Sequence, residues 1–277
     1  MKETKKFISP NNWFSFEYPS AWYEFEDGEG SFLFYNPTQW DGNFRISGFK
    51  GDDILFGKQF VAEERKLNHK IKPYNLSEGL AVYDVSFFTQ DDHEFASYRW
   101  ILGLDDMGFE CTFTTLKEES IHVAEEILRT IKVRDLTKKY PAEIIPIRLS
   151  EIYTINESYD WTVNLVKDNL TVDFQGVEED ISKLDKIKES DLIGRKKGDK
   201  WQALGLTLGV ILSNEIDGME WRTLIDGNRE DAILYYIPTN KIIDPMKLVW
   251  SKVKAGEDFS ITDSYKEVLA SLHTSEA

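Results

Sequence analysis

The sequence predicts an α+β protein of two domains, each with antiparallel strands packed against helices, the second domain being helix-rich. Three observations support this fold class. In the first half, strand-like segments precede and follow one helical segment, and a second helical segment ends the half. In the second half, a long apolar helical segment precedes a hairpin and a proline-started helix. Between the halves, charges and two prolines interrupt the patterning, so we predict domains at 1–137 and 138–277 with a linker at about 134–147.

The first half is a succession of short strands. Apolar and polar residues alternate in a run that starts at Trp13 and ends at Pro19. Further strands are predicted at 23–26, 32–35, 44–49, 71–75, 81–88, 95–104 and 109–116. Glycine and acidic residues at 27–30 predict a hairpin turn between the first two of these strands. Helical spacing of apolar residues predicts two helices, at about 52–68 and 121–131.

A long apolar segment dominates the second half. The run 201–212 is apolar on nearly every side, which predicts a buried helix, and Asp199 is suited to be its N-cap. Gly205 and Gly209 lie four residues apart and therefore share one face of that helix. Because neither residue has a side chain, we expect another element to approach this face closely.

A hairpin and a second helix are predicted after the apolar helix. The turn residues Asp226-Gly227-Asn228 separate two strand-like runs, 220–226 and 231–237. Pro245 fits the first turn of a helix, where its missing N–H is harmless, and Gly256 fits the end of that helix. Two weaker helical patterns lie upstream, at 153–169 and 177–189.

The charge of the chain restricts its partners. The 277 residues include 33 Lys and Arg against 49 Asp and Glu, which gives a net charge of −16. Such a charge repels phosphate backbones and anionic lipid, so we expect neither nucleic-acid binding nor membrane binding. It attracts basic proteins, although acidity can also serve solubility alone. The oligomeric state is not predicted.

Cysteine, histidine and motif content argue against several enzyme classes. The single cysteine, Cys111, excludes an intrachain disulfide and a multi-cysteine metal site, and its strand-like surroundings predict a buried, inert thiol. The four histidines are scattered, with no pair at metal-ligand spacing, and no phosphate-binding loop or nucleophile elbow is present. We therefore expect no metal and no cofactor, and a binding protein rather than an enzyme. The N-terminal segment carries positive charge without an apolar core, which predicts a cytoplasmic protein.

An aromatic motif near the N-terminus carries a resemblance. Phe16, Tyr18, Pro19 and Trp22 form the pattern F-x-Y-P-x-x-W. Together with the order of strands and helices, this motif resembles the entry of the PsbP-like fold, over roughly residues 7–134. PsbP-like folds are usually binding modules, so by analogy of fold the resemblance implies a binding role.

The whole chain is similar to uncharacterised two-domain bacterial proteins of the kind found in gut Bacteroidetes. Their second domain carries the pattern LG-x(3)-G…EW…D. In this sequence the pattern is formed by Leu204, Gly205, Gly209, Glu220, Trp221 and Asp226. The resemblance implies no known activity, and it assigns no catalytic residue.

Two segments are candidates for binding because of their local composition. Trp40 lies in the turn-like segment NPTQWDGN, and an exposed Trp in a loop is suited to a protein contact. Arg195, Lys196 and Lys197 concentrate positive charge just before a predicted helix. They can meet a phosphate or an acidic group at the start of that helix, or form a solvated loop.

Two functions of different classes follow from these observations. The leading hypothesis is a non-catalytic cytoplasmic module that binds a basic protein, for example in immunity-like neutralisation of a basic toxin. It rests on the net charge, the fold resemblance and the missing catalytic motifs. The alternative is a small-ligand-binding or hydrolase-like domain with a pocket in the second half, near Trp221 and Asp226. A third hypothesis is a domain that serves only oligomer assembly.

Overall fold

The structure, a computed structural model, describes residues 3–26 and 31–272. The hairpin turn expected at 27–30 lies outside the described residues. The chain divides into two compact units, Met1–Pro141 and Ala142–Ala277. The boundary falls inside the segment 134–147, where the sequence places a linker. Each unit is an α+β structure with antiparallel sheets, so the predicted fold class is confirmed.

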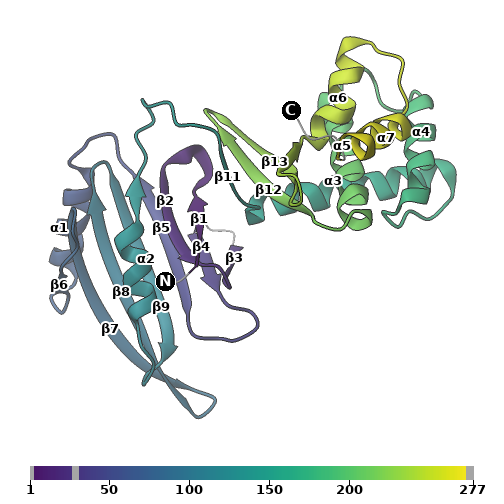
Figure 1. The fold of residues 1–277 in the computed structure, drawn as a ribbon. Helices are drawn as coiled ribbons and strands as arrows, with labels where there is room; N and C mark the ends of the chain where they lie inside the picture. Colours follow the sequence, from purple (N-terminus) through teal and green to yellow (C-terminus); the bar gives the residue numbers. More distant parts are fainter. Residues whose placement is uncertain (1–2, 27–30, 273–277) are drawn as a thin grey trace. The chain divides into compact units, whose positions relative to one another are not determined.

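The first unit is built on a seven-stranded antiparallel sheet of order β3-β4-β5-β9-β8-β7-β6 (Figure 1). Its strands are β3 (Tyr23–Glu26), β4 (Ser31–Tyr35), β5 (Asn43–Lys50), β6 (Lys72–Tyr74), β7 (Leu80–Gln90), β8 (His93–Leu104) and β9 (Met107–Leu116). A smaller sheet holds β1 (Thr4–Ile8), β2 (Phe14–Pro19) and β10 (Lys132–Val133), and a short 3-10 turn, η1 (Pro10–Asn12), joins its first two strands. Two helices complete the unit, α1 (Phe56–Leu67) and α2 (His122–Thr130).

Aromatic side chains form the main core of the first unit. One face of the large sheet packs against β1, β2 and α2, and the rings of Phe7, Phe16 and Phe34 meet there with centroids 5.1 to 5.3 Å apart. Cys111 is fully buried in the same core, and burial raises the pKa of its thiol well above the ordinary value. The predicted burial of the thiol is therefore confirmed, and its inertness stays a prediction.

Helix α1 covers one end of the opposite face of the sheet. Val61 packs there against Val82 and Ile101. The approach is close because Gly103 of β8 faces Gly57 of α1, and a Cβ on Gly103 would stand 2.0 Å from the Gly57 carbonyl oxygen. Toward the other end of this face, strand alternation places half-buried and exposed side chains that no helix of the described chain covers.

The second unit surrounds one buried helix. Helix α5 (Gly198–Glu215) is packed by the other four helices and by a four-stranded sheet of order β11-β12-β13-β14. The helices are α3 (Leu149–Leu170), α4 (Ile181–Glu189), α6 (Pro245–Ala255) and α7 (Ile261–Leu272). A short 3-10 turn, η2 (Glu178–Asp180), precedes α4. The strands are β11 (Glu143–Pro146), β12 (Met219–Asp226), β13 (Arg229–Tyr236) and β14 (Lys241–Ile243). The predicted buried helix, hairpin and proline-started helix are confirmed.

Two glycines allow α6 to lie directly on α5. A Cβ on Gly205 would stand 2.3 Å from the carbonyl oxygen of Pro245, which opens α6. A Cβ on Gly209 would stand 2.6 Å from the ring of Trp221 and 3.0 Å from the ring of Pro245. The shared face of the two glycines is thus a packing surface, as the sequence predicts.

Some local predictions are wrong. The N-cap position of α5 is Lys197, and the expected cap Asp199 lies inside the first turn without a capping bond. Strands β11 and β14 were not predicted, because each is only three or four residues long and forms by pairing with β12 or β13. Helix α7 was not predicted either.

Asp180 fixes the entry to α4. Its carboxylate is buried and accepts hydrogen bonds from the backbone N–H groups of Gln175 and Gly176, at 2.6 and 2.8 Å. It also pairs with Lys183. Burial alone would raise the pKa of the Asp180 carboxyl, but the bonds from Lys183 and the backbone outweigh burial and lower it.

The substitution Asp180→Asn is expected to lower the free energy of unfolding by about 1–3 kcal/mol near neutral pH. Because the folded-state pKa lies below the unfolded value of about 3.9, the stabilisation from the charge is complete above that value. It is lost as pH falls through the folded-state pKa. The urea midpoints of wild type and variant should therefore converge below about pH 4. A difference that persists unchanged in acid would contradict a role for the carboxylate charge.

Candidate functional site

An apolar pocket lies on the uncovered part of the large sheet of the first unit. It has a volume of about 380 Å³ and is lined by Trp40, His93, Phe95 and Leu116. Trp40 comes from the loop between β4 and β5, and the other three come from β8 and β9. Phe95 pairs directly with Leu116 across these strands, so sheet register brings them together.

The Trp40 loop is ordered by its own residues. The side-chain oxygen of Asn36 accepts hydrogen bonds from the backbone N–H groups of Thr38 and Gln39, at 3.0 and 3.3 Å. At the end of the loop, Gly42 has a φ of +113°, which L side chains rarely adopt. The indole of Trp40 is held in place yet remains 43% exposed.

Aromatic rings continue from the pocket to the edge of the sheet. The ring of Trp40 meets the ring of Phe95 edge-on at 6.0 Å, and Phe95 stacks on Phe88 of β7 at 5.3 Å. Phe88 is 42% exposed and its neighbour Phe87 is 59% exposed. Consecutive exposed aromatics point to opposite faces of a strand, so neither face of this hairpin end is covered.

Carboxylates are frequent near the pocket residues in the sequence. Within two residues of a lining residue the chain carries five acidic side chains and one basic one, and all of them are exposed: Asp41, Asp91, Asp92, Glu94, Glu118 and Lys117. The ammonium of Lys117 lies 3.0 Å from the Glu94 carboxylate. By strand alternation this pair lies on the face of Phe87, opposite the pocket, so Asp41, Asp91 and Asp92 are the exposed carboxylates next to the pocket loop and the hairpin turn.

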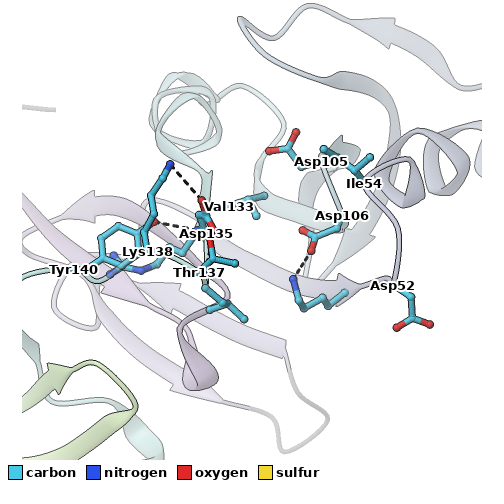
Figure 2. A pocket seen from close by; sticks show the side chains of 12 residues that line it. Asp52, Ile54, Asp105, Asp106, Val133, Asp135, Thr137, Lys138 and Tyr140 are labelled. Atoms are coloured by element: carbon cyan, nitrogen blue, oxygen red, sulfur yellow. Dashed lines mark hydrogen bonds and ion pairs between the residues drawn. The ribbon is translucent and has the colours of Figure 1, made fainter.

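A second pocket of the first unit is polar. It measures about 680 Å³, and its lining includes Asp52, Asp105 and Tyr140 (Figure 2). Charges within it pair with one another: Lys50 lies 2.5 Å from Asp106 and Lys138 lies 3.3 Å from Asp135. The lining carries both signs of charge, so it presents no single sign to a ligand: Lys50, Arg134 and Lys138 against Asp52, Asp105, Asp106 and Asp135.

The predicted candidates of the second unit are not gathered into one site. The indole N–H of Trp221 donates to the hydroxyl of Ser213 at 3.2 Å, and the ring packs over Gly209. Asp226 is exposed at the hairpin turn, five residues further along β12, which is roughly 16 Å along a strand. The small-ligand pocket expected near these residues stays a prediction.

The basic segment before α5 is exposed. Arg195, Lys196 and Lys197 all lie at the surface, and Lys197 occupies the N-cap position. Next to them, the ammonium of Lys200 lies 4.7 Å from the centre of the Trp161 ring. The phosphate-binding and solvated-loop interpretations of this segment both stay predictions.

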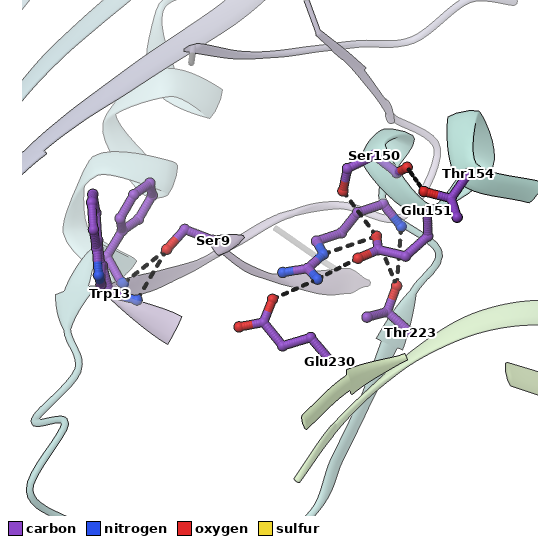
Figure 3. Close-up of polar contacts among 9 residues, drawn as sticks. Ser9, Trp13, Ser150, Glu151, Thr154, Thr223 and Glu230 are labelled. Carbon is purple, nitrogen blue, oxygen red and sulfur yellow. Dashed lines mark hydrogen bonds and ion pairs between the residues drawn. The ribbon is translucent and has the colours of Figure 1, made fainter. Parts of the chain in front are cut away.

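A buried ion cluster at the start of α3 is structural. The guanidinium of Arg148 is 2% exposed and donates to the carboxylates of Glu151 and Glu230, the latter at 2.8 Å (Figure 3). Its backbone N–H donates to the hydroxyl of Thr223 of β12 at 3.2 Å. Burial lowers the pKa of Arg148, but the two carboxylates outweigh burial and raise it. The cluster thus ties α3 to β12 and β13.

The described residues contain no group of three or more His, Cys, Asp or Glu side chains that could hold a metal ion. Within the same residues, no helix is long and apolar enough to cross a membrane.

Trp40 stands out in the sequence, but the residues around it do not. His93 is one of four scattered histidines, and Phe95, Leu116 and Phe88 are predicted only as parts of strands. The signal that could have found them is the pair Phe87-Phe88, because two consecutive aromatics cannot both face the core of a single sheet.

Comparisons with known proteins place the chain in a family. Residues 2–156 match "Domain of unknown function (DUF3805)", and residues 180–265 match a second one, DUF3806. A crystal structure of a protein from Bacteroides thetaiotaomicron VPI-5482, at 1.50 Å resolution, is 50% identical. The match covers 96% of this chain and 98% of that chain with a TM-score of 0.91, which confirms the resemblance to two-domain Bacteroidetes proteins. No curated protein matches the chain.

Two solved structures are similar to the N-terminal half at low identity, where the PsbP-like resemblance was expected. One is cyanobacterial PsbP from Synechocystis sp. PCC 6803, which is 11% identical. The match covers 48% of this chain and 94% of that chain with a TM-score of 0.27. The other is LpqN of Mycobacterium tuberculosis, described as involved in cell envelope biogenesis, which is 12% identical. The match covers 48% of this chain and 91% of that chain with a TM-score of 0.31. At these scores we draw no function from either.

Proposed function

The chain belongs to the DUF3805 family, whose description states no activity, and from this premise we propose that it is a non-catalytic cytoplasmic module that binds a basic partner protein. An immunity-like inhibitor of a basic toxin is one specific form of this role. The observation that carries the proposal is the aromatic pocket at Trp40, whose indole is exposed, with the exposed Asp41, Asp91 and Asp92 next to its lining residues in the chain. The cytoplasmic location is supported by the single buried cysteine, since exported proteins commonly rely on disulfides.

The chemistry of the pocket suits a cationic protein surface. A Trp or Phe ring that is already held by its neighbours loses little conformational freedom on binding, so it makes an efficient anchor. The exposed carboxylates of Asp41, Asp91 and Asp92 attract Lys and Arg, and the rings of the pocket can stack on the apolar stems of these side chains. Long-range attraction to the net charge of −16 should speed the encounter and make association salt-dependent.

The variant Trp40→Ala should lose the partner without losing the fold. Because the indole is 43% exposed, we expect the free energy of unfolding to change by less than about 1 kcal/mol. Removing an anchor of about 2 kcal/mol weakens binding about thirtyfold. Host proteins would be captured on wild type and on the variant at low and high salt and quantified by mass spectrometry, followed by titration of the recovered partner.

Tyr153→Ala provides a matched control. Tyr153 is an exposed aromatic of the second unit, 50% exposed on α3, so its loss should leave binding unchanged. The proposal is supported if wild type and Tyr153→Ala bind the same basic protein equally and Trp40→Ala does not retain it. The affinity for that protein should also fall as the salt concentration rises. A partner held equally by all three proteins, or no protein that distinguishes Trp40→Ala from wild type, would overturn the proposal.

A further inference from the structure

The outer edge of β7 is only partly paired. On one side β7 pairs with β8 along its whole length, from Leu80 to Gln90. On the other side β6 pairs only with the three residues 81–83. Among the described residues, no strand lies beside the segment 84–90 on that outer side. Figure 1 shows the β7–β8 hairpin extending beyond the end of α2.

The free backbone groups of this edge can be assigned. Pro73 of β6, which has no N–H, lies opposite Val82, so residues 81 and 83 supply the bonds to β6. The β7–β8 register is regular up to the two-residue turn at 91–92, so the alternation continues without a bulge. The N–H and C=O groups of Val85, Phe87 and Thr89 therefore point away from β8, toward solvent.

Along residues 87–90 this edge lacks the devices that usually prevent strand addition, whereas Lys70 and Lys72 line a pocket together with Asp84, Val85 and Ser86. Natural edge strands are protected by proline, lysine, a bulge or extreme shortness. The strand β6 shows three of them, because it is only three residues long and contains Lys72 and Pro73. The segment 84–90 reads DVSFFTQ, and its exposed members include Val85, Phe87 and Phe88. It is seven residues long, three of them apolar, and it contains no proline or lysine, which suits a strand that accepts another strand.

We infer that an extended, basic segment of the partner protein adds to this edge of β7 as an eighth strand of the large sheet. The inference rests on the proposed function, because it specifies how the partner reaches the Trp40 pocket. Backbone bonds to Val85, Phe87 and Thr89 would hold the segment. Every second side chain of the segment would lie on the face of the sheet that carries Phe88 and the pocket.

Two observations favour a basic partner segment as the occupant. The ring row Trp40–Phe95–Phe88 runs from the pocket to the β7 edge without interruption, so one ligand can contact both. At the turn of the hairpin, Asp91 and Asp92 are exposed. A second copy of this chain would bring another net charge of −16 to the same place, which opposes pairing of two β7 edges.

Synthetic peptides on the full-length chain test the inference. The probes are fluorescent peptides of about ten residues in which Lys alternates with Val or Phe, and a matched set has Glu in place of Lys. The tightest lysine peptide is then N-methylated at one backbone position at a time. A strand that adds to one edge uses every second N–H. We therefore expect losses of about tenfold or more at alternate positions and little change between them.

Substitutions at Phe87 of the protein give a second test of strand addition. Phe87→Ala and Phe87→Pro both remove the ring, but only proline removes the outward N–H, and an edge position with its N–H toward solvent tolerates proline. We expect Phe87→Pro to bind the lysine peptide about tenfold more weakly than Phe87→Ala. Thermal unfolding of both variants shows that they are folded. The N-methyl scan needs no variant and stands if Phe87→Pro fails to fold.

The outcomes separate the inference from the function on which it rests. Strand addition is overturned if N-methylation weakens binding without a period of two along the peptide. It is also overturned if both Phe87 variants bind equally well while Trp40→Ala binds weakly. Either result leaves the binding function intact. Equal affinity for lysine and glutamate peptides overturns the basic partner itself. Peptides that bind neither wild type nor variants overturn strand addition. A wild-type dimer that Phe87→Pro dissociates in sedimentation makes a second copy the occupant and also overturns the inference.

Discussion

Replacing Arg148 by methionine is expected to lower the free energy of unfolding by about 3–5 kcal/mol, the usual cost of removing one partner from a buried ion pair. The guanidinium is 2% exposed and is shared by Glu151 and Glu230, whose side chains are 14% and 20% exposed. Methionine fills a similar volume but leaves two carboxylates of like charge close together without a cation. Chemical denaturation followed by hydrogen exchange of α3 and β12 would measure the loss and locate it.

Two further variants establish the physical cause. Arg222 pairs with Glu220 at 2.5 Å, but both side chains are well exposed, 30% and 46%. Arg222→Met should therefore cost less than about 1 kcal/mol. Adding Glu151→Gln and Glu230→Gln to Arg148→Met should recover much of the stability, because no unpaired charge then remains buried. If that triple variant is no more stable than Arg148→Met alone, packing rather than charge dominates at this position.

The substitution Gly205→Ala is expected to lower the free energy of unfolding by about 2 kcal/mol or more, since overpacking a filled core costs about 1–3 kcal/mol and occasionally more. The new methyl carbon would stand 2.3 Å from the backbone oxygen of Pro245 and 3.1 Å from the Cα of Met246. Neither is a flexible side-chain end, so α6 as a whole must move. In an exposed helix the same change would stabilise by about 1 kcal/mol, so the clash determines the sign.

Gly194→Ala is the matched control for Gly205→Ala. The nearest atom to its added Cβ is the Cγ of Lys197 at 3.9 Å, and its backbone conformation suits any residue. We expect its urea midpoint to match that of wild type. A Gly205→Ala protein that is more stable than wild type would show that helix propensity outweighs the contact, and that α6 yields more easily than a rigid helix should.

Local sequence rules predicted the second unit because its elements are marked by residues with one structural use. Pro245 starts α6, Gly256 ends it with a φ of +72°, and Gly227 turns the hairpin with a φ of +62°. These signals act within a few residues and need no knowledge of the tertiary fold. The missed strands β11 and β14 carry no such mark, because only their pairing with longer strands makes them strands.

The candidate site could be predicted only in part for a similar reason. Trp40 stands out in the sequence because a loop of turn residues rarely buries a Trp. Its neighbours Phe95 and Leu116 lie more than fifty residues away in the chain, and the sheet order β5-β9-β8 brings them to it. Strand order and register are tertiary properties, so no spacing rule in the sequence could reveal the pocket.

The burial of Cys111 makes this protein well suited to site-specific labelling. The chain has one native thiol, which is fully buried and whose raised pKa keeps it protonated at neutral pH. A cysteine introduced at an exposed position such as Thr89 would therefore be the one that reacts with a maleimide dye. A fluorophore placed there would report on events at the β7 edge in the folded, full-length chain without prior removal of the native cysteine.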